Sequence, residues 1–368
     1  MEYREIDTPA LLIDREILMD NLRFMQAYAD KNRVALRPHA KTHKMPYIAG
    51  LQLEQGACGI AVAKVGEAEV MARNGISDIF IANEIVGQKK LERIRELSKS
   101  ARVAFGVDSP FQVREAERVF AEGETAAEVL VEIEVGENRS GIIEEADFES
   151  LLEAIRSCPH VRFRGLFSHD GNSYGAKDLE ECKGIALGAQ RRTLRFVQLA
   201  KELGMACETV SYGSTPTLMN EVEILEGITE IRPGTYVLMD ASQANAIGTL
   251  ERCAATVLAT VISRPTATRV ILDVGAKGLT MQERTRGICA TPGKGTILEY
   301  PGIHIHEMFD EHAIIYDRTF RDAVQIGDKV RIIPVHICPV CNLYDSAYLV
   351  SGGRVVGEIP ILCRGKLA

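Results

Sequence analysis

The stretch VGEAEVMARNGISDIFIA, residues 65–82, decides the fold of this chain. Its first part, 65–75, places apolar side chains at helical spacing and ends in a glycine, which commonly stops a helix. A short apolar run rich in isoleucine follows at 78–82 and predicts a buried strand. Helices that alternate with buried strands are typical of a parallel sheet with covering helices.

The same unit recurs along the first two-thirds of the chain. Further helical patterns occupy 90–100 and 190–204. The strand-like runs lie at 34–38, 59–63, 78–82, 103–107, 129–135, 162–168, 207–212 and 228–233. Eight such units predict an α/β fold closed into a (β/α)8 TIM barrel. A doubly wound open sheet is the alternative, although eight strands would be long for it.

The pattern changes after about residue 245. Strand-like runs then follow one another with turns between them and without a long helical pattern. This predicts a second, C-terminal all-β domain, and the polar segment 240–249, rich in small residues, is typical of a linker. We expect a barrel over 9–243 and a β-strand domain formed by 1–8 and 244–368.

The composition of the 368 residues excludes several classes of protein. A net charge of −8 argues against nucleic-acid binding, because phosphate contacts need a basic surface. No apolar run approaches the roughly 18 residues that span a bilayer, and the acidic N-terminal residues do not resemble a signal peptide. Nine scattered cysteines, an odd number, are not a disulfide framework. We therefore expect a cytoplasmic protein that binds neither nucleic acid nor a membrane.

Candidate site residues follow the predicted strands at their carboxyl ends, where a TIM barrel carries its active site. They are Lys41, Arg139, His169, Tyr174, Ser214, Thr215, Gly234, Thr235 and Tyr236. The small and hydroxyl-bearing members follow the last two strands, where barrels often bind phosphate. A phosphate site, a lysine and a histidine together suggest pyridoxal phosphate (PLP). Taken singly, each has an ordinary alternative as a surface charge, a helix cap or a core histidine.

A second candidate site lies in VHICPVCNLYD, residues 335–345. A redox dithiol should open a helix after a strand, but this segment lies in the predicted all-β region and is followed by another strand-like run. A structural zinc site needs four ligands, and the next cysteine, Cys363, stands alone. In an extended segment His336 and Cys338, two residues apart, would point to the same side and reach one ion, with Cys341 facing elsewhere.

Motifs along the whole chain resemble those of the D-threonine aldolase/D-serine dehydratase family, which are alanine-racemase-like, fold-type III PLP enzymes. They are DTPALLID (7–14), RPHAKTHK (37–44), GNSYG (171–175), GSTPT (213–217), PGTYVLMD (233–240) and HICPVCNL (336–343). The resemblance implies a PLP barrel followed by a β-domain. It also implies a homodimer whose active sites lie at the subunit interface.

The resemblance implies roles for the candidate residues. Lys41 would form the Schiff base with PLP, Arg139 would contact the phenolic oxygen, and His169 would pack on the pyridine ring. The phosphate would be held by Ser214, Thr215, Gly234 and Thr235. The neighbours of cofactor or substrate would be Tyr174 and Tyr236. His312 falls in a family-like segment, where a catalytic role or an interface role is implied.

In the family the His-x-Cys pair binds zinc beside PLP, which implies that His336 and Cys338 are metal ligands here. Two protein ligands leave positions open for substrate and water. The aldolase branch tends to carry an aspartate where Cys338 stands, and a carboxylate there suits Mn²⁺ or Mg²⁺. The cysteine therefore favours Zn²⁺ and the dehydratase branch.

The implied function is that of a PLP- and metal-dependent lyase that acts on D-3-hydroxy amino acids. Dehydration and deamination of D-serine or 3-hydroxy-D-aspartate to a 2-oxo acid and ammonia is the expected reaction. Retro-aldol cleavage of the D-threonine aldolase type, to glycine and an aldehyde, is the first alternative. An amino-acid racemase, a PLP carrier and a redox protein remain as further alternatives.

Overall fold

A computed structural model describes all 368 residues and divides the chain into two compact units. The barrel unit comprises Met25–Lys41, Pro46–Gly234 and Gly365–Ala368. The sheet unit comprises Met1–Phe24, Thr42–Met45 and Thr235–Arg364. The chain passes from one unit to the other between Lys41 and Thr42 and again between Gly234 and Thr235, both within predicted site motifs.

Eight parallel strands form the barrel unit, and each of the eight predicted runs overlaps one of them. The strands are β2 (Ala35–Leu36), β3 (Ile60–Val62), β4 (Asp78–Glu84), β5 (Arg102–Val107), β6 (Ala127–Ile133), β7 (Val161–Ser168), β8 (Thr209–Tyr212) and β9 (Glu230–Ile231). Their order in the sheet is β2-β9-β8-β7-β6-β5-β4-β3. The predicted parallel α/β architecture is therefore confirmed.

The sheet closes between its two end strands, β2 and β3. The main-chain N–H of Cys58 donates to the carbonyl of Leu36 at 2.9 Å, and that of Ala61 donates to Pro38 at 2.8 Å. The N–H of Ala40 in turn donates to the carbonyl of Ala61 at 2.8 Å. These bonds complete a ring of eight strands, so the TIM barrel is confirmed and the open sheet is excluded.

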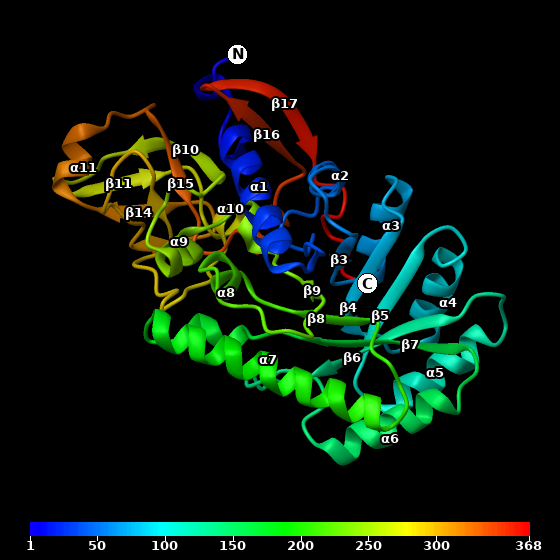
Figure 1. Cartoon of the computed structure of the whole chain (residues 1–368). Coiled ribbons are helices and arrows are strands. Elements are labelled where there is room, and N and C mark those ends of the chain that lie inside the picture. Colours follow the sequence, from blue (N-terminus) through cyan, green and yellow to red (C-terminus); the bar gives the residue numbers. More distant parts are fainter. The chain divides into compact units, whose positions relative to one another are not determined.

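Helices follow the barrel strands and lie along their outer side (Figure 1). They are α2 (Pro46–Glu54), α3 (Val65–Arg73), α4 (Gln88–Leu97), α5 (Pro110–Phe120), α6 (Glu145–Arg156), α7 (Leu179–Glu202), α8 (Thr215–Met219) and the 3-10 turn η2 (Gly171–Gly175). Helix α5 shows why they form: Pro110 begins it, and the Gln112 side chain accepts from the N–H of Ser109. Val113, Ala116 and Phe120 are its buried face.

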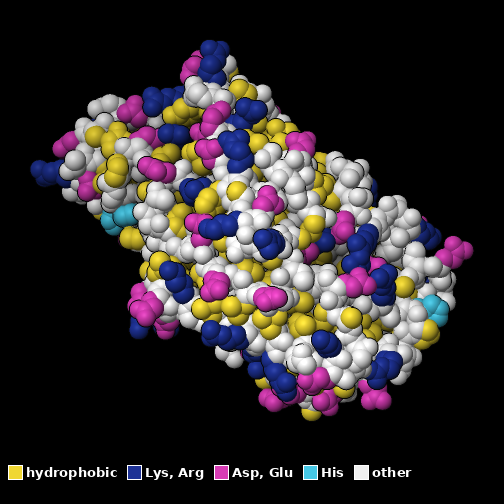
Figure 2. Space-filling model, viewed as in Figure 1, with side chains coloured by type: hydrophobic (Ala, Val, Ile, Leu, Met, Phe, Trp, Pro, Cys, Tyr) yellow, Lys and Arg dark blue, Asp and Glu magenta, His cyan; other side chains and the backbone are white.

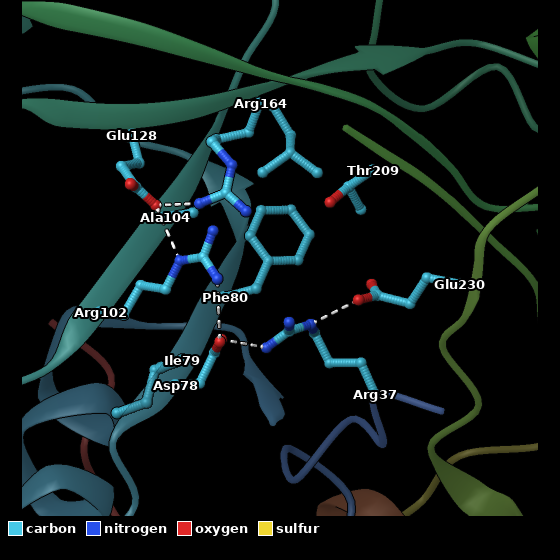
Figure 3. Close-up of a pocket in the computed structure, with 11 residues that line it drawn as sticks. Arg37, Asp78, Ile79, Phe80, Arg102, Ala104, Glu128, Arg164, Thr209 and Glu230 are labelled. Atoms are coloured by element: carbon cyan, nitrogen blue, oxygen red, sulfur yellow. Dashed lines mark hydrogen bonds and ion pairs between the residues drawn. The ribbon is translucent and has the colours of Figure 1, made fainter. Parts of the chain in front are cut away.

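Alternate residues of the barrel strands fill the interior in layers. A buried apolar layer contains Ala61, Phe80, Leu130 and Phe167, and the two phenyl rings meet edge to face at 5.1 Å. Towards the amino ends of the strands lies a ring of ion pairs (Figure 3). Its members are Arg37, Asp78, Arg102, Glu128, Arg164 and Glu230. This ring seals the end of the barrel opposite the loops that carry the candidate residues.

Nine strands form one sheet in the other unit. They are β1 (Ala10–Asp14), β10 (Ala255–Ser263), β11 (Arg269–Leu272), β12 (Thr296–Ile297), β13 (Glu307–Met308), β14 (Ala313–Tyr316), β15 (Lys329–Ile333), β16 (Ser346–Ser351) and β17 (Arg354–Pro360). The path β13-β14-β11-β10-β1-β16-β17 places β1 inside the sheet, antiparallel to β10 and parallel to β16. This confirms the C-terminal strand-rich region and adds an N-terminal strand to it.

Short helices interrupt the region predicted to be all-β. They are α9 (Ala241–Ile247), α10 (Ala276–Leu279), α11 (Arg318–Ala323) and α12 (Ile337–Cys341), with the 3-10 turns η1 (Tyr3–Glu5) and η3 (Thr235–Val237); the longer α1 (Arg15–Asn32) follows β1. Helix α9 occupies the segment predicted as a linker and is capped at its N-terminus by the buried Asp240. The prediction of an extended backbone through 336–338 is wrong, because α12 begins at Ile337.

The surface carries both signs of charge. Figure 2 shows Lys and Arg interspersed with Asp and Glu over the visible face, without a broad basic area of the kind that binds nucleic acid. None of the helices combines the length and the apolar character needed to cross a membrane.

Candidate active site

The carboxyl end of the barrel brings together Lys41, Arg139 and His169. The N–H of Lys41 donates to His39 Nδ1 at 3.4 Å, which ties the loop after β2 to a buried ring. His169 Nδ1 lies 3.0 Å from the carbonyl of Gly213, and His169 and Tyr174 lie with ring centroids 6.4 Å apart. The carbonyl can only accept, so His169 donates from Nδ1.

Both histidines at this end of the barrel are uncharged. Burial, followed by the charge of Lys41, holds the pKa of His39 well below its usual 6.5. Burial and Lys41 act in the same way on the pKa of His169. A neutral imidazole can pack on an aromatic ring without the cost of burying a charge. This fits the role implied for His169, which is to pack on the pyridine ring of PLP.

A carboxylate that the sequence motifs did not single out lies between these residues. Glu137 Oε2 lies 3.3 Å from Arg139 Nη1 and 4.0 Å from His169 Nε2. Burial raises the pKa of Glu137, although Arg139 and Lys41 oppose the rise. No spacing rule could have selected Glu137, because its two partners lie on different loops.

Hydroxyl groups cluster beyond β8. Ser214 Oγ lies 3.1 Å from Ser173 Oγ and 3.2 Å from Thr217 Oγ1. Ser214 is the N-cap residue of α8 but makes no side-chain capping bond, so the ordinary explanation of a helix cap does not account for it. Behind the cluster, Tyr212 donates to the fully buried Asp170 at 2.7 Å.

These barrel residues fit PLP chemically. Lys41 offers an amine, Arg139 a guanidinium for an anionic oxygen, and His169 a neutral ring. The hydroxyls of Ser214 and Thr215 are almost fully buried, and hydroxyl groups can donate to a phosphate. The barrel unit therefore contains the donor set that the cofactor requires.

In the sheet unit His336 is oriented by an aspartate. Asp240 Oδ2 lies 2.9 Å from His336 Nδ1 and accepts from the N–H of Ile337 at 3.1 Å. Asp240 is fully buried and also caps α9 by accepting from the N–H of Gln243 at 2.9 Å. Because Nδ1 is engaged, His336 presents Nε2 as the nitrogen for a metal.

Cys338 lies next to His336 although the backbone between them is not extended. Its Sγ lies 3.2 Å from Thr42 Oγ1 and 3.6 Å from Thr235 Oγ1. Burial alone would raise the pKa of Cys338, but the charge of His336 and hydrogen bonds from its neighbours lower it to about 7. For His336 burial acts in the opposite direction and would lower the pKa, because it disfavours the charged imidazole. The Cys338 thiolate and Asp240 nevertheless raise the pKa of His336 to about 10.

The pair fits a two-ligand divalent site. The structure contains no group of three or more His, Cys, Asp or Glu side chains arranged to hold a metal ion. A thiolate and an oriented imidazole are ligands that zinc accepts, and the remaining positions would be taken by water or substrate. Asp240 would hold the imidazole of such a site in place; the sequence put this residue at the end of the PGTYVLMD motif and in the predicted linker but assigned it no role.

The structure places two further predicted residues in different surroundings. Tyr236 is fully buried in the turn η3. His312 is exposed at a surface hollow that it shares with Met281 and Phe309.

Comparisons with known proteins cover nearly the whole chain. Residues 13–242 match the alanine racemase N-terminal domain, and residues 254–350 match a putative serine dehydratase domain. The D-threonine aldolase of an Arthrobacter species is 35% identical over 98% of this chain and 93% of its own length.

Two solved structures are similar throughout. A D-threonine aldolase from Filomicrobium marinum has a TM-score of 0.90 and 32% identity, covering 100% of this chain and 98% of that one. The D-threo-3-hydroxyaspartate dehydratase from Delftia sp. HT23 has a TM-score of 0.91 and 28% identity, covering 98% of both chains. A cysteine-to-alanine variant of that dehydratase has been solved in a metal-free form.

Proposed function

We propose that this chain is a PLP- and metal-dependent lyase of D-3-hydroxy amino acids. It belongs to the D-threonine aldolase and D-serine dehydratase family, which has an alanine racemase-type barrel. Of the similar proteins named above, two are D-threonine aldolases and one is a D-threo-3-hydroxyaspartate dehydratase. Of the two reactions, we propose dehydration and deamination to a 2-oxo acid and ammonia.

The observation that carries the proposal is the His336–Cys338 pair oriented by Asp240. Its neighbour Thr42, whose Oγ1 lies 3.2 Å from Cys338 Sγ, directly follows Lys41 in the chain. The metal-free form of the related dehydratase, obtained with a cysteine variant, supports Cys338 as a ligand.

In this proposal the chain's own residues divide the work. PLP, when bound, supplies an electron sink for negative charge at Cα. Lys41 would hold the cofactor and move the proton at Cα, while Arg139 and the hydroxyls around Ser214 would hold its anionic groups. His336 and Cys338 would hold a divalent ion, for which we propose Zn²⁺ on the basis of the thiolate; such an ion would supply Lewis acidity for the β-hydroxyl of the substrate.

Aldol cleavage is the second candidate, favoured by the 35% identity to the Arthrobacter D-threonine aldolase. The same metal site would then hold the hydroxyl while the Cα–Cβ bond breaks to give glycine and an aldehyde. A thiolate in place of a harder carboxylate ligand is the feature that favours dehydration over this reaction.

The deciding experiment incubates the protein, loaded with PLP and Zn²⁺, with D-serine, D-threonine and 3-hydroxy-D-aspartate. We expect equal amounts of a 2-oxo acid and ammonia. If the products are glycine and an aldehyde, or glycine and glyoxylate, the reaction is aldol cleavage and the dehydratase proposal is wrong. Formation of the L-enantiomer without metal would overturn the lyase proposal and indicate a racemase.

Variants control this assay. Lys41→Ala is expected to give no product and no visible absorbance from lysine-bound cofactor, because the attachment point is gone. Lys31→Ala, which removes an exposed lysine, is expected to retain both. Visible absorbance that persists in Lys41→Ala would assign the cofactor to another lysine.

The proposal extends to a homodimer in the cytoplasm. Met281 and Phe309 are apolar and more than half exposed beside His312, as at a surface that a second copy could cover. Nine free cysteines are typical of a reducing compartment. Light scattering measures the mass of the particle in solution, and a value for a single chain would remove the dimer from the proposal.

A further inference from the structure

Four carboxyl groups gather near the loop of the arginine assigned to the cofactor, and two of them, Glu132 and Glu137, contact Arg139 itself. They come from different elements of the barrel unit: Glu84 ends β4, Asp108 follows β5, Glu132 lies near the end of β6, and Glu137 lies in the loop beyond it. So many acidic groups at the carboxyl end of the barrel would repel an anionic cofactor unless they are paired with cations. Their position near Arg139 suggests that they orient this arginine.

The loop that carries Arg139 is folded back onto β6. The N–H of Ile142 donates to the carbonyl of Glu132 at 2.8 Å, and the N–H of Glu134 donates to the carbonyl of Ile142 at 3.1 Å. Gly141, with φ +100°, permits this close return, since a Cβ there would stand 3.0 Å from Cγ of Glu132. The backbone of the loop is therefore fixed around the Glu132 side chain.

Glu132 is the buried anchor of this loop. Its side chain is 6% exposed, accepts from Ser140 Oγ at 2.7 Å and lies 3.6 Å from Arg139 Nη2. The Arg139 side chain is 50% exposed, and its guanidinium lies between two carboxylates: Glu132 on Nη2 and Glu137, at 3.3 Å, on Nη1. A flexible arginine is ordered at lower entropic cost when a fixed carboxylate sets its position.

Glu84 is the neighbour that allows Glu132 to be charged. Burial, a hydrogen bond with Glu132 and the charge of Glu132 raise the pKa of Glu84 to about 9. Two buried carboxyls in contact do not both ionise near neutral pH. Glu84 therefore carries a proton at neutral pH and can donate it in a hydrogen bond to the Glu132 carboxylate.

We propose that Glu132 is the positioning residue for Arg139, and that Glu84 is its protonated partner. Glu132 directs the guanidinium towards the place where an anionic oxygen of the cofactor would lie. Glu84 satisfies the far side of Glu132 without adding a second negative charge. This inference rests on the proposed function, in which Arg139 contacts PLP.

The first test compares Glu132→Gln with Glu153→Gln, which removes an exposed carboxylate on α6. In Glu132→Gln we expect PLP affinity to fall about tenfold. The pH midpoint of the visible absorbance of lysine-bound PLP should rise by about one unit, because a displaced Arg139 no longer disfavours the protonated form. Glu153→Gln should match the wild type, and Glu132→Asp should recover part of the loss. Unchanged affinity and midpoint in Glu132→Gln would overturn the proposal.

The second test uses the protein without cofactor, so that it does not depend on the proposed function. The Nε–H signal of Arg139, assigned with Arg139→Lys, should be sharp in the wild type and broadened in Glu132→Gln. Equal line widths would refute the positioning role. A wild type that binds no PLP but shows the expected broadening would reject the proposed function and leave the positioning intact.

The third test addresses the proton on Glu84. The wild type takes up this proton on folding at any pH between about 4.5 and 9, so its stability relative to Glu84→Gln should fall as pH rises. The urea midpoint of Glu84→Gln minus that of the wild type should therefore increase from pH 6 to pH 8.5. A constant difference would show that Glu84 is ionised in the fold and would remove it from the proposal.

Discussion

At the scale of the residue, Asp240 shows how a side chain outside the ligand pair determines what the pair can do. It holds Nδ1 of His336 at 2.9 Å and fixes the backbone of Ile337, which begins α12. The imidazole is thereby held in one orientation with Nε2 available. His336 and Cys338 could be selected from the sequence because of their type and spacing, but Asp240 lies 96 residues away and could not.

Cys338→Ala tests the metal site against its neighbour Cys341. Loss of the thiolate should lower zinc content and zinc affinity at least tenfold, while PLP absorbance remains, because one of two protein ligands is gone. Cys341→Ala should retain zinc, since Cys341 is fully buried and burial raises the pKa of its thiol well above the usual value. Metal analysis after dialysis gives both values.

The comparison also has a contrary outcome. Equal loss of zinc in Cys338→Ala and Cys341→Ala would mean that both thiols bind the ion. Because α12 places them one helical turn apart, this geometry is accessible in principle, whereas the predicted extended segment would have opposed it. Retention of zinc in both variants would remove the cysteines from the site.

At the scale of the element, the seam between β2 and β3 is where the barrel depends on single residues. Arg37 reaches from the end of β2 to Asp78 of β4 at 2.6 Å and to Glu230 of β9 at 2.8 Å (Figure 3). It passes over Gly59, where a Cβ would stand 2.3 Å from Arg37 Nη1. A glycine before β3 is therefore needed for Arg37 to link strands on both sides of the closure.

Arg37→Met should destabilise the barrel by about 3 kcal/mol, because it leaves Glu230 as a buried charge without its partner. Arg162→Met is the matched control from the same end of the barrel. Its side chain is 54% exposed, so the loss should be below about 1 kcal/mol. Urea denaturation measures both free energies of unfolding. Similar losses would show that the network does not depend on the buried pairs.

At the scale of the whole molecule, the sequence pattern predicted those features that depend on residues close together in the chain, such as the barrel strands. Each of the eight barrel strands overlaps a predicted run, because parallel strands buried on both faces give continuous apolar runs such as 78–82. Closure of the barrel followed from their number. The position of β1 in the other sheet could not be predicted from the sequence, because its pairing with β10 and β16 joins residues more than 240 positions apart.

The candidate site divides in the same way. Lys41, Arg139 and His169 were selected because carboxyl ends of parallel strands meet at one edge, and the structure brings them together. Glu137, Glu132 and Asp240 were missed, because burial and contacts between distant segments give them their roles. The helix at 337–341 was missed since five residues show no periodicity.

The buried His39 should make the free energy of unfolding depend on pH. Its pKa lies well below 6.5 in the fold, so below about pH 6.5 the unfolded chain takes up a proton that the folded chain does not. Between pH 7.5 and 5.5 the wild type should lose about 1.4 kcal/mol relative to His39→Gln. Urea denaturation of both proteins at the two pH values isolates this contribution from those of other groups. A difference that does not change with pH would mean that His39 titrates alike in both states.

The interior position of β1 bears on how the chain is made. Ala10–Asp14 leaves the ribosome early, yet its neighbour β10 begins only at Ala255 and β16 at Ser346. At about 5–20 residues per second, the strand ALLID waits for at least ~12 seconds before either partner exists. All but the last of its residues are buried in the finished sheet. During translation this short apolar segment therefore stays without its sheet partners, and the central strands of the sheet unit cannot pair until β10 and β16 have been made.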